Sequence, residues 1–209
     1  MIATRHKKVG RQQGFTLIEA LIAFLILSVG LLGIVSLQAM AKTSQHQAIQ
    51  RTRAVSLADA LIERIRVNPA GVETYNIGTA APVGSASLGM TEPTANCRDA
   101  ACTPVELATH DLWAWEQALD GAMATITEGG NTTNVGGLVT PRGCVLFTPF
   151  GGRTRTGLIT VVIQWQGQRS STDGVAADGI ECATTAVIPD LTLRRQVAVN
   201  TFVVDETEF

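Results

Sequence analysis

Few side chains suited to acid–base or nucleophilic catalysis lie near one another in this sequence. Its three histidines, His6, His46 and His110, are far apart. No spacing of serine, histidine and aspartate around them is typical of a catalytic triad, and no spacing is typical of a metal site. The sequence therefore predicts neither catalytic residues nor a cofactor, so the chain is not expected to be an enzyme.

A short acidic segment is the remaining candidate for ion binding. Asp173, Asp178 and Glu181 lie near two glycines, and their carboxylates are oxygen ligands of the kind that calcium prefers. Their spacing lacks the pattern of an EF-hand loop, and acidic segments of this kind are usually solvated. We therefore interpret the segment as a solvated acidic loop and predict no metal.

One carboxylate, that of Glu19, lies in an otherwise apolar segment. Residues 15–41 read FTLIEALIAFLILSVGLLGIVSLQAMA, and Glu19 is their only charged residue. A run of this length is typical of a membrane-spanning helix, in which a central charge costs about 2.5–3.5 kcal/mol and needs a partner. Glu19 therefore indicates either a specific partner or a tolerated interfacial charge at the end of an ordinary anchor.

Basic residues set the orientation of this span. Four of them precede it, Arg5, Lys7, Lys8 and Arg11, and the nearest basic residues after it are Lys42, Arg51 and Arg53. The positive-inside rule then keeps the leader in the cytoplasm and exports the rest of the chain. With a formal net charge of −2, the chain is not expected to bind nucleic acid, which needs a clustered basic surface.

Two cleavage sites compete around the span. Ala39-Met40-Ala41 has the small residues of a secretory signal-peptide site, and cleavage there would leave a mature chain beginning at Lys42. The apolar run, however, is longer than the roughly 7–15 residues of such a signal and contains a carboxylate. We therefore favour the other site, which lies within residues 14–19, G-F-T-L-I-E, directly after the basic leader.

Residues 14–19 resemble the prepilin peptidase signature of type IV pilins and related pseudopilins. In that family the peptidase cuts after the glycine, here Gly14, and methylates the new N-terminal phenylalanine, here Phe15. The resemblance also implies that Glu19, the fifth mature residue, pairs with the N-terminal amine of a neighbouring subunit. Such pairing neutralises both charges and sets the axial register of the filament.

The helix is expected to continue beyond the membrane. Residues 42–68 contain no proline or glycine, and Pro69 and Gly71 supply a stop. Apolar residues recur there at helical spacing and predict a stripe that packs on a globular domain: Ala54, Leu57, Ala58, Leu61, Ile62 and Ile65. The chain then divides into a leader (1–14), the transmembrane half of the helix (15–41), its amphipathic half (42–68) and an exported domain with a connecting loop (69–209).

The exported domain is expected to combine one more helix with a sheet. Residues 70–110 have the composition of a connector, residues 110–127 show helical periodicity, and residues 128–137 indicate a loop. Strands are expected at residues 143–148, 158–166 and 194–204, and an edge or paired strand is considered at 135–139. The fold class is therefore α+β: the resemblance implies the type IV pilin fold, a long N-terminal helix packed on a C-terminal antiparallel sheet. Trp115 and Trp165 fall on predicted buried faces, so we expect both in the core.

All four cysteines follow the span, so they belong to the exported, oxidising side. Their even number suggests two disulfides among Cys97, Cys102, Cys144 and Cys182. Three pairings are possible, and we favour Cys97–Cys102 as a small loop with Cys144–Cys182 linking the strands to the following loop. A zinc site is disfavoured because no Cys-x-x-Cys pair occurs.

Weaker cues point to a subfamily. Asp111-x-x-x-Trp115, the segment from Val161 to Trp165 and the final strand resemble the minor pilin PilV. That resemblance implies a non-catalytic subunit that helps to initiate assembly, first anchored in the bacterial inner membrane with its domain in the periplasm and then in the filament or at its tip. The implied partners are the prepilin peptidase, other minor pilins, the major pilin, the inner membrane assembly platform and a tip adhesin.

Two other functions remain open at this stage. A minor pseudopilin of type II secretion has the same leader and fold, so the sequence barely separates it from a pilus subunit. A singly anchored periplasmic receptor or enzyme would be supported by clustered carboxylates or by a nucleophile beside its base, and neither occurs here.

Overall fold

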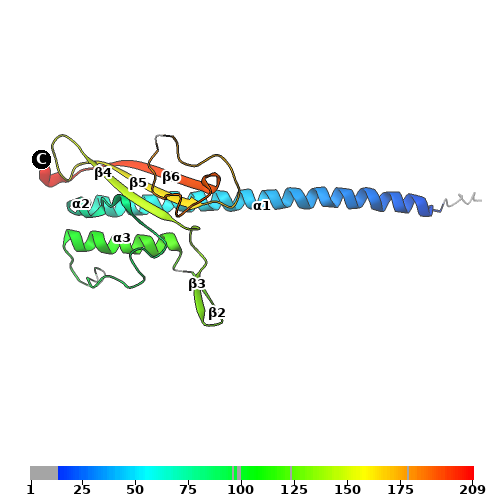
Figure 1. Cartoon of the computed structure of the whole chain (residues 1–209), viewed down its shortest axis with the longest axis horizontal. Coiled ribbons are helices and arrows are strands. Elements are labelled where there is room, and N and C mark those ends of the chain that lie inside the picture. Colours follow the sequence, from blue (N-terminus) through cyan, green and yellow to red (C-terminus); the bar gives the residue numbers. More distant parts are fainter. Residues whose placement is uncertain (1–13, 96, 98–99, 123, 178) are drawn as a thin grey trace, which may run out of the picture. The chain divides into compact units, whose positions relative to one another are not determined.

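The computed structural model describes residues 14–95, 97, 100–122, 124–177 and 179–209 (Figure 1). It divides the chain into two compact units, Met1–Gln45 and His46–Phe209, which share one long helix. Residues 1–13, with the four basic residues that precede the apolar segment, and Asp178 lie outside the described residues.

Helix α1, Leu17–Val67, is 51 residues long and includes the whole of the apolar segment from residue 17 onward. Its large apolar side chains in the first unit are exposed. Among the described residues, α1 is the one helix that is long and apolar enough to cross a membrane. The expected continuous helix is therefore confirmed, and it ends before Pro69 as the sequence indicates.

The part of α1 in the second unit buries the expected stripe. Its fully or nearly fully buried residues are Gln50, Ala54, Ala58, Leu61, Ile62 and Ile65. The two alanines leave space for close packing, and the branched side chains that follow them fill the hydrophobic core. Asp59, Glu63 and Arg66 are exposed, as the helical spacing predicts.

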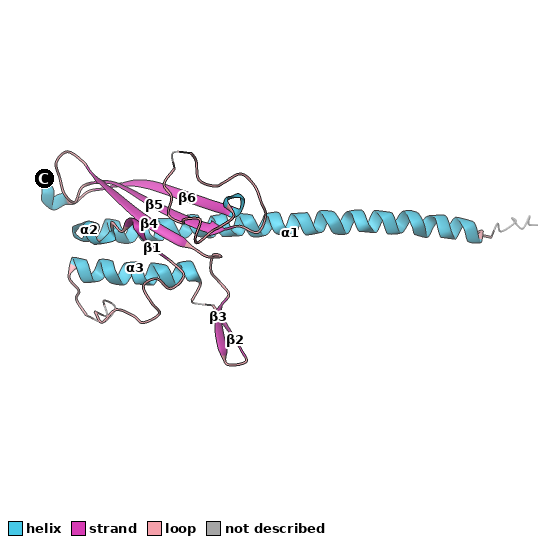
Figure 2. Ribbon diagram, in the orientation of Figure 1, coloured by secondary structure: helices cyan, strands magenta, loops and turns pink. Residues whose placement is uncertain are grey.

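A four-stranded antiparallel sheet packs on this stripe (Figure 2). Its order is β1-β4-β5-β6, with bounds β1 Gly78–Val83, β4 Arg142–Pro149, β5 Gly157–Gln166 and β6 Arg194–Val203. The three later strands confirm the sequence prediction. Strand β1 corrects it: the edge strand comes from the expected connector, because Gly78 and Val83 pair with β4, whereas residues 135–139 form no strand.

Helix α3, Pro104–Asp120, begins and ends about six residues earlier than predicted. Thr103 caps it through a reciprocal capping box: Glu106 N donates to Thr103 Oγ1 (3.3 Å), and Thr103 N donates to Glu106 Oε2 (2.8 Å). The Glu106 carboxylate accepts hydrogen bonds from the backbone N–H and the hydroxyl of Thr103, and these two bonds lower its pKa. At the other end, Gly121 adopts a left-handed conformation and stops the helix.

The segment after α3 also differs from the prediction. Strands β2, Thr125–Glu128, and β3, Asn131–Asn134, form a two-stranded hairpin where the sequence suggested the end of a helix and a loop. Short helical turns complete the fold: η1 Pro69–Gly71, α2 Val72–Tyr75, η2 Leu191–Leu193 and η3 Glu206–Glu208.

A buried carboxylate, Asp111, joins α1, α2 and α3. Its Oδ1 accepts from Arg64 Nη1 (2.9 Å), and its Oδ2 accepts from the Tyr75 hydroxyl (2.5 Å). Burial and the hydrogen bond to Asp111 raise the pKa of Tyr75, so the phenol remains protonated. One turn later, Trp115 is 3% exposed and donates from Nε1 to the carbonyl of Leu57 (3.0 Å), which confirms it as a core residue.

We expect the helix stop at Gly121 to be sensitive to substitution. Gly121 has φ +69°, and a methyl group there would overlap the backbone of Gly137. Gly121→Ala combines left-handed strain with overpacking, each about 1–2 kcal/mol, so Tm should fall by about 10 °C. Thermal unfolding of the full chain in detergent, followed by tryptophan fluorescence, measures this change.

Gly129→Ala is the matched control. Gly129 has a similar φ of +58°, but nothing lies within 4 Å of a methyl group there. It should therefore lower Tm by only about 3 °C, from the strain alone. Equal effects of the two substitutions would contradict the close contact of Gly121 with Gly137.

Candidate functional site

The candidate site is the short segment at which α1 begins. Gly14 to Thr16 are not helical, and α1 starts at Leu17. The carbonyl of Thr16 accepts from Glu19 N (3.1 Å) and Ala20 N (3.2 Å), so Thr16 occupies the position that caps the helix. A chain cut after Gly14 would therefore begin two residues before the first turn.

Nothing in the described fold requires glycine at position 14. Gly14 is exposed, and a methyl group built there meets no atom within 4 Å. Gly14 is also not among the glycines with a left-handed backbone. A preference for glycine at this position therefore has to come from another molecule that binds the segment, such as a peptidase whose cleft admits no side chain.

The side chains of Phe15 and Glu19 are both exposed and can contact another molecule. Phe15 is 78% exposed, and Glu19 lies exposed in the first turn of α1, where the helix dipole favours a negative charge. No side chain of the described residues forms a salt bridge with the Glu19 carboxylate. A carboxylate in an apolar span needs a positive partner, so Glu19 is available to pair with a group outside the described side chains.

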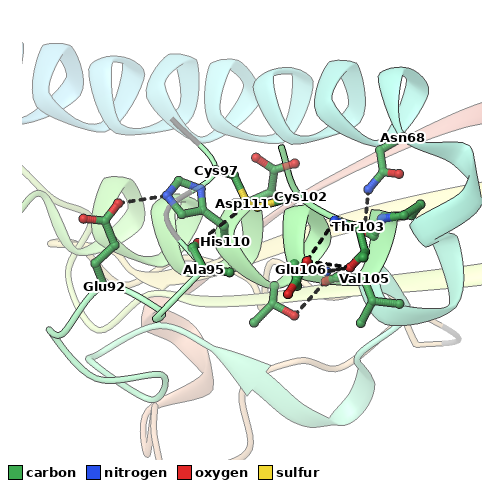
Figure 3. Close-up of a disulfide and its surroundings, with 12 residues drawn as sticks. Asn68, Glu92, Ala95, Cys97, Cys102, Thr103, Val105, Glu106, His110 and Asp111 are labelled. Atoms are coloured by element: carbon green, nitrogen blue, oxygen red, sulfur yellow. Dashed lines mark hydrogen bonds and ion pairs between the residues drawn. A yellow bond between two sulfur atoms is a disulfide. The ribbon is translucent and has the colours of Figure 1, made fainter. Parts of the chain in front are cut away.

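Two disulfides lie in the second unit, in the pairing that the sequence analysis favours. Cys97–Cys102 has a Cα–Cα distance of 5.5 Å and lies directly before Thr103, at the start of α3 (Figure 3). Cys144–Cys182 has a Cα–Cα distance of 5.8 Å and joins β4 to the loop that precedes β6. The second pair is buried on the outer face of the sheet.

The acidic loop is not simply solvated. Asp173 Oδ2 accepts from Arg194 Nη2 (2.5 Å), and Glu181 Oε1 accepts from Arg194 Nη1. The Arg194 side chain is only 5% exposed, so two carboxylates neutralise a buried cation. The hydrogen bond from Arg194 lowers the pKa of Asp173. Both carboxylates therefore fix the loop to β6, which corrects the interpretation as a solvated loop.

The two histidines that the structure describes, His46 and His110, form no catalytic cluster. His110, a residue of α3, has its Nε2 2.9 Å from Oε1 of Glu92 in the connector (Figure 3). His46 is exposed on α1, and His6 lies outside the described residues. Across the described part of the chain, no group of three or more histidine, cysteine or acidic residues is arranged to hold a metal ion.

Sequence reasoning missed the buried acids of α3. Glu116 is fully buried and accepts from Gly84 N (2.8 Å), Leu88 N (2.8 Å) and the Ser87 hydroxyl (2.5 Å). Together with Asp111 it fixes the connector and the end of α1 to α3. The sequence does place the two acids, Asp111 and Glu116, close to the apolar stripe of α3 that contains Trp115. Periodicity alone predicts that acidic side chains on a helix face solvent, so it did not indicate their burial.

Two family models match adjacent parts of the chain. Residues 10–35 match the prokaryotic N-terminal methylation motif, and residues 36–113 match a family described as Type IV pilin Tt1218. Comparisons with curated proteins and with solved structures gave no match. The two matches support a type IV pilin subunit, a structural class of protein associated with a membrane and with pilus assembly.

The exposed N-terminal segment generates a prediction about processing. Mass spectrometry of the mature chain should find N-methylated Phe15 at its start, because residues 14–19 carry the signature and Gly14 is open to a peptidase. Gly14→Val should block this cleavage without disturbing α1, since no atom of the fold contacts a side chain there. A mature chain beginning at Lys42 would be incompatible with a pilin-type leader.

The disulfides generate a second prediction. Alkylation of the unfolded chain without reductant should label none of the four cysteines, whereas prior reduction should expose all four. Peptide mapping should recover the pairs Cys97–Cys102 and Cys144–Cys182. Quantitative labelling without reduction would refute the oxidised state of these cysteines.

Proposed function

We propose that this chain is a minor subunit of a type IV pilus that has no catalytic activity and helps other minor pilins to prime assembly. Prepilin peptidase removes the leader, residues 1–14, and methylates Phe15. Residues 15–41 then anchor the subunit in the inner membrane and later pack in the filament. Residues 42–68 carry the exported domain, residues 69–209, which faces the periplasm before assembly.

The observation that carries this proposal is the carboxylate of Glu19 in the first turn of α1, within the apolar segment, where no described side chain forms a salt bridge with it. An isolated anchor gains nothing from that charge, because it raises the free energy of insertion. A filament subunit does gain, because the amine of Phe15 on a neighbour neutralises it. The pair also selects one axial register, since any other register leaves two charges buried without partners.

A minor role is supported by the helix and by the packing of α3. Helix α1 contains no proline, whereas major pilins usually carry a helix-breaking proline in this region. Asp111 and Trp115, which resemble the PilV subfamily, contact α1 through Arg64 and Leu57. These residues therefore hold α3 against α1. Their resemblance to the subfamily thus concerns how the domain packs on its helix and not a ligand site.

The proposed partners follow from the assembly pathway. They are the peptidase, the inner membrane assembly platform, other minor pilins, the major pilin and an adhesin at the filament tip. A pseudopilin of a type II secretion system would use the same leader, helix and charge pair. A defective pilus subunit should reduce piliation, whereas a defective pseudopilin should reduce secretion. Measuring both in the same cells therefore distinguishes the two functions.

Glu19→Ala should separate assembly from anchoring. Membrane insertion should be unchanged or improved, because removing the charge lowers the free energy of insertion. Filament formation should fall sharply, since the Phe15 amine of the neighbour would then be buried without a counter-charge. Piliation and secretion are measured in cells that express only the variant, with cleavage after Gly14 and membrane abundance checked in parallel.

Asp59→Ala is the matched control. It removes an exposed carboxylate from the same helix, outside the apolar span, and should leave assembly unchanged. Normal filaments with Glu19→Ala at normal abundance would show that Glu19 is merely a tolerated interfacial charge. A loss of secretion with intact pili would reassign the chain to a secretion pseudopilus.

A further inference from the structure

The two edges of the four-stranded sheet differ in their ability to accept another strand. Strand β1, at one edge, is six residues long and contains Pro82, which has no N–H to donate. Its register with β4 also shifts between Gly78 and Val83. Short, irregular strands with proline are a common way to prevent pairing with another chain, so the β1 edge is protected.

Strand β6, at the opposite edge, has none of these protections. It pairs with β5 in unbroken register over ten residues, from Arg194 to Val203. Its residues 197–203, VAVNTFV, contain no charge, proline or glycine and are rich in β-branched side chains. A long, regular and uncharged edge strand is a template for strand addition unless something covers it.

Hydrogen bonds at the start of β6 show which backbone groups face outward. Gly167 N donates to the carbonyl of Leu193 (2.7 Å), on the β5 side, whereas the carbonyl of Arg194 accepts from Gly174 N (3.0 Å). Because outward and inward groups alternate in an antiparallel ladder, Ala198, Asn200 and Phe202 point their N–H and C=O groups away from β5. All three residues are exposed, and no described strand pairs with this edge.

An apolar patch adjoins the same edge. Phe202 is 46% exposed, pairs across the sheet with exposed Leu158 and lies edge-on to exposed Phe150, with ring centroids 5.6 Å apart. These side chains lie on the outer face of the sheet, away from the core that faces α1. A strand added to β6 could therefore bury apolar side chains on this patch while its backbone pairs with β6.

We propose that the outer edge of β6 binds the first-strand edge of a different pilin subunit, in antiparallel orientation, as a continuation of the sheet. This inference rests on the proposed function. Successive strands of the sheet alternate in direction, so β1 and β6 run in opposite directions. A neighbour of the same fold and orientation therefore presents its first strand antiparallel to β6. That first strand should contain uncharged, β-branched residues.

A second copy of this chain fits the edge poorly. Its own β1 carries Pro82 and the register shift, so it cannot continue the ladder. Pairing of β6 with β6 would require a two-fold axis that reverses the strand direction. Residues 46–67 of α1 pack along the same sheet and would be reversed as well, which is unfavourable for two chains that enter one membrane in the same orientation.

Amide hydrogen exchange can test this pairing. The full chain is compared alone in detergent and in filaments or minor-subunit complexes purified from cells that express all subunits. In the isolated chain, the amides of Ala198, Asn200 and Phe202 should exchange rapidly, because they face solvent. In the complex they should slow by about 100-fold, whereas amides on the β1 edge should be unchanged.

Asn200→Pro provides a second test with a matched control. It removes one outward N–H without removing a bond to β5, and should lower incorporation into the complex by about tenfold. Asn200→Thr keeps the N–H and a β-prone side chain and should assemble like the wild type. Cleavage after Gly14, membrane abundance and both disulfides report whether each variant folds.

The outcomes separate this inference from the proposed function. Complexes in which the three amides still exchange rapidly would overturn the inference alone, as would normal incorporation of Asn200→Pro. Protection that appears in a dimer of this chain would also overturn it, because the partner would then be a second copy. Failure of the wild-type chain to enter any complex would overturn the proposed function and this inference together.

Discussion

Burial of one stripe of α1 is the constraint on which the second unit, His46–Phe209, depends. A helix gains little stability in water from its own hydrogen bonds, so residues 46–67 require a surface that covers Ala58, Leu61 and Ile65. The sheet and α3 supply that surface, and the same core contains Trp115 and Trp165. The helix and the sheet therefore depend on each other, because each one buries the other's hydrophobic face.

Buried acids give this core one defined arrangement. An apolar stripe tolerates small rotations of the helix, but Asp111 must meet both Arg64 and Tyr75 to remain satisfied. Glu116 imposes the same condition on the backbone of Gly84 and Leu88. A misplaced α3 would leave carboxylates buried without partners, so these contacts specify position more than they add stability.

Periodicity predicted most of the fold, but local and long-range polar contacts decided the rest. The long helix and β4 to β6 follow from apolar spacing, whereas the start of α3 depends on the capping pair Thr103 and Glu106. Strand β1 lacks a strong strand pattern and forms because β4 offers an edge. The motif predicts Gly14, Phe15 and Glu19 as site residues, whereas no local pattern predicts the pairing of Arg194 with two acids that are distant in the sequence.

The disulfide between β4 and the loop before β6 has a mechanical consequence. Tension on a filament pulls each subunit along its chain. A disulfide prevents the residues between its two cysteines from being extended by that tension. Cys144 and Cys182 are separated by 38 residues, which include all of central strand β5. If the sheet yields under load, the bridge shortens the maximum extension of the subunit by about 130 Å, because an extended chain spans about 3.5 Å per residue.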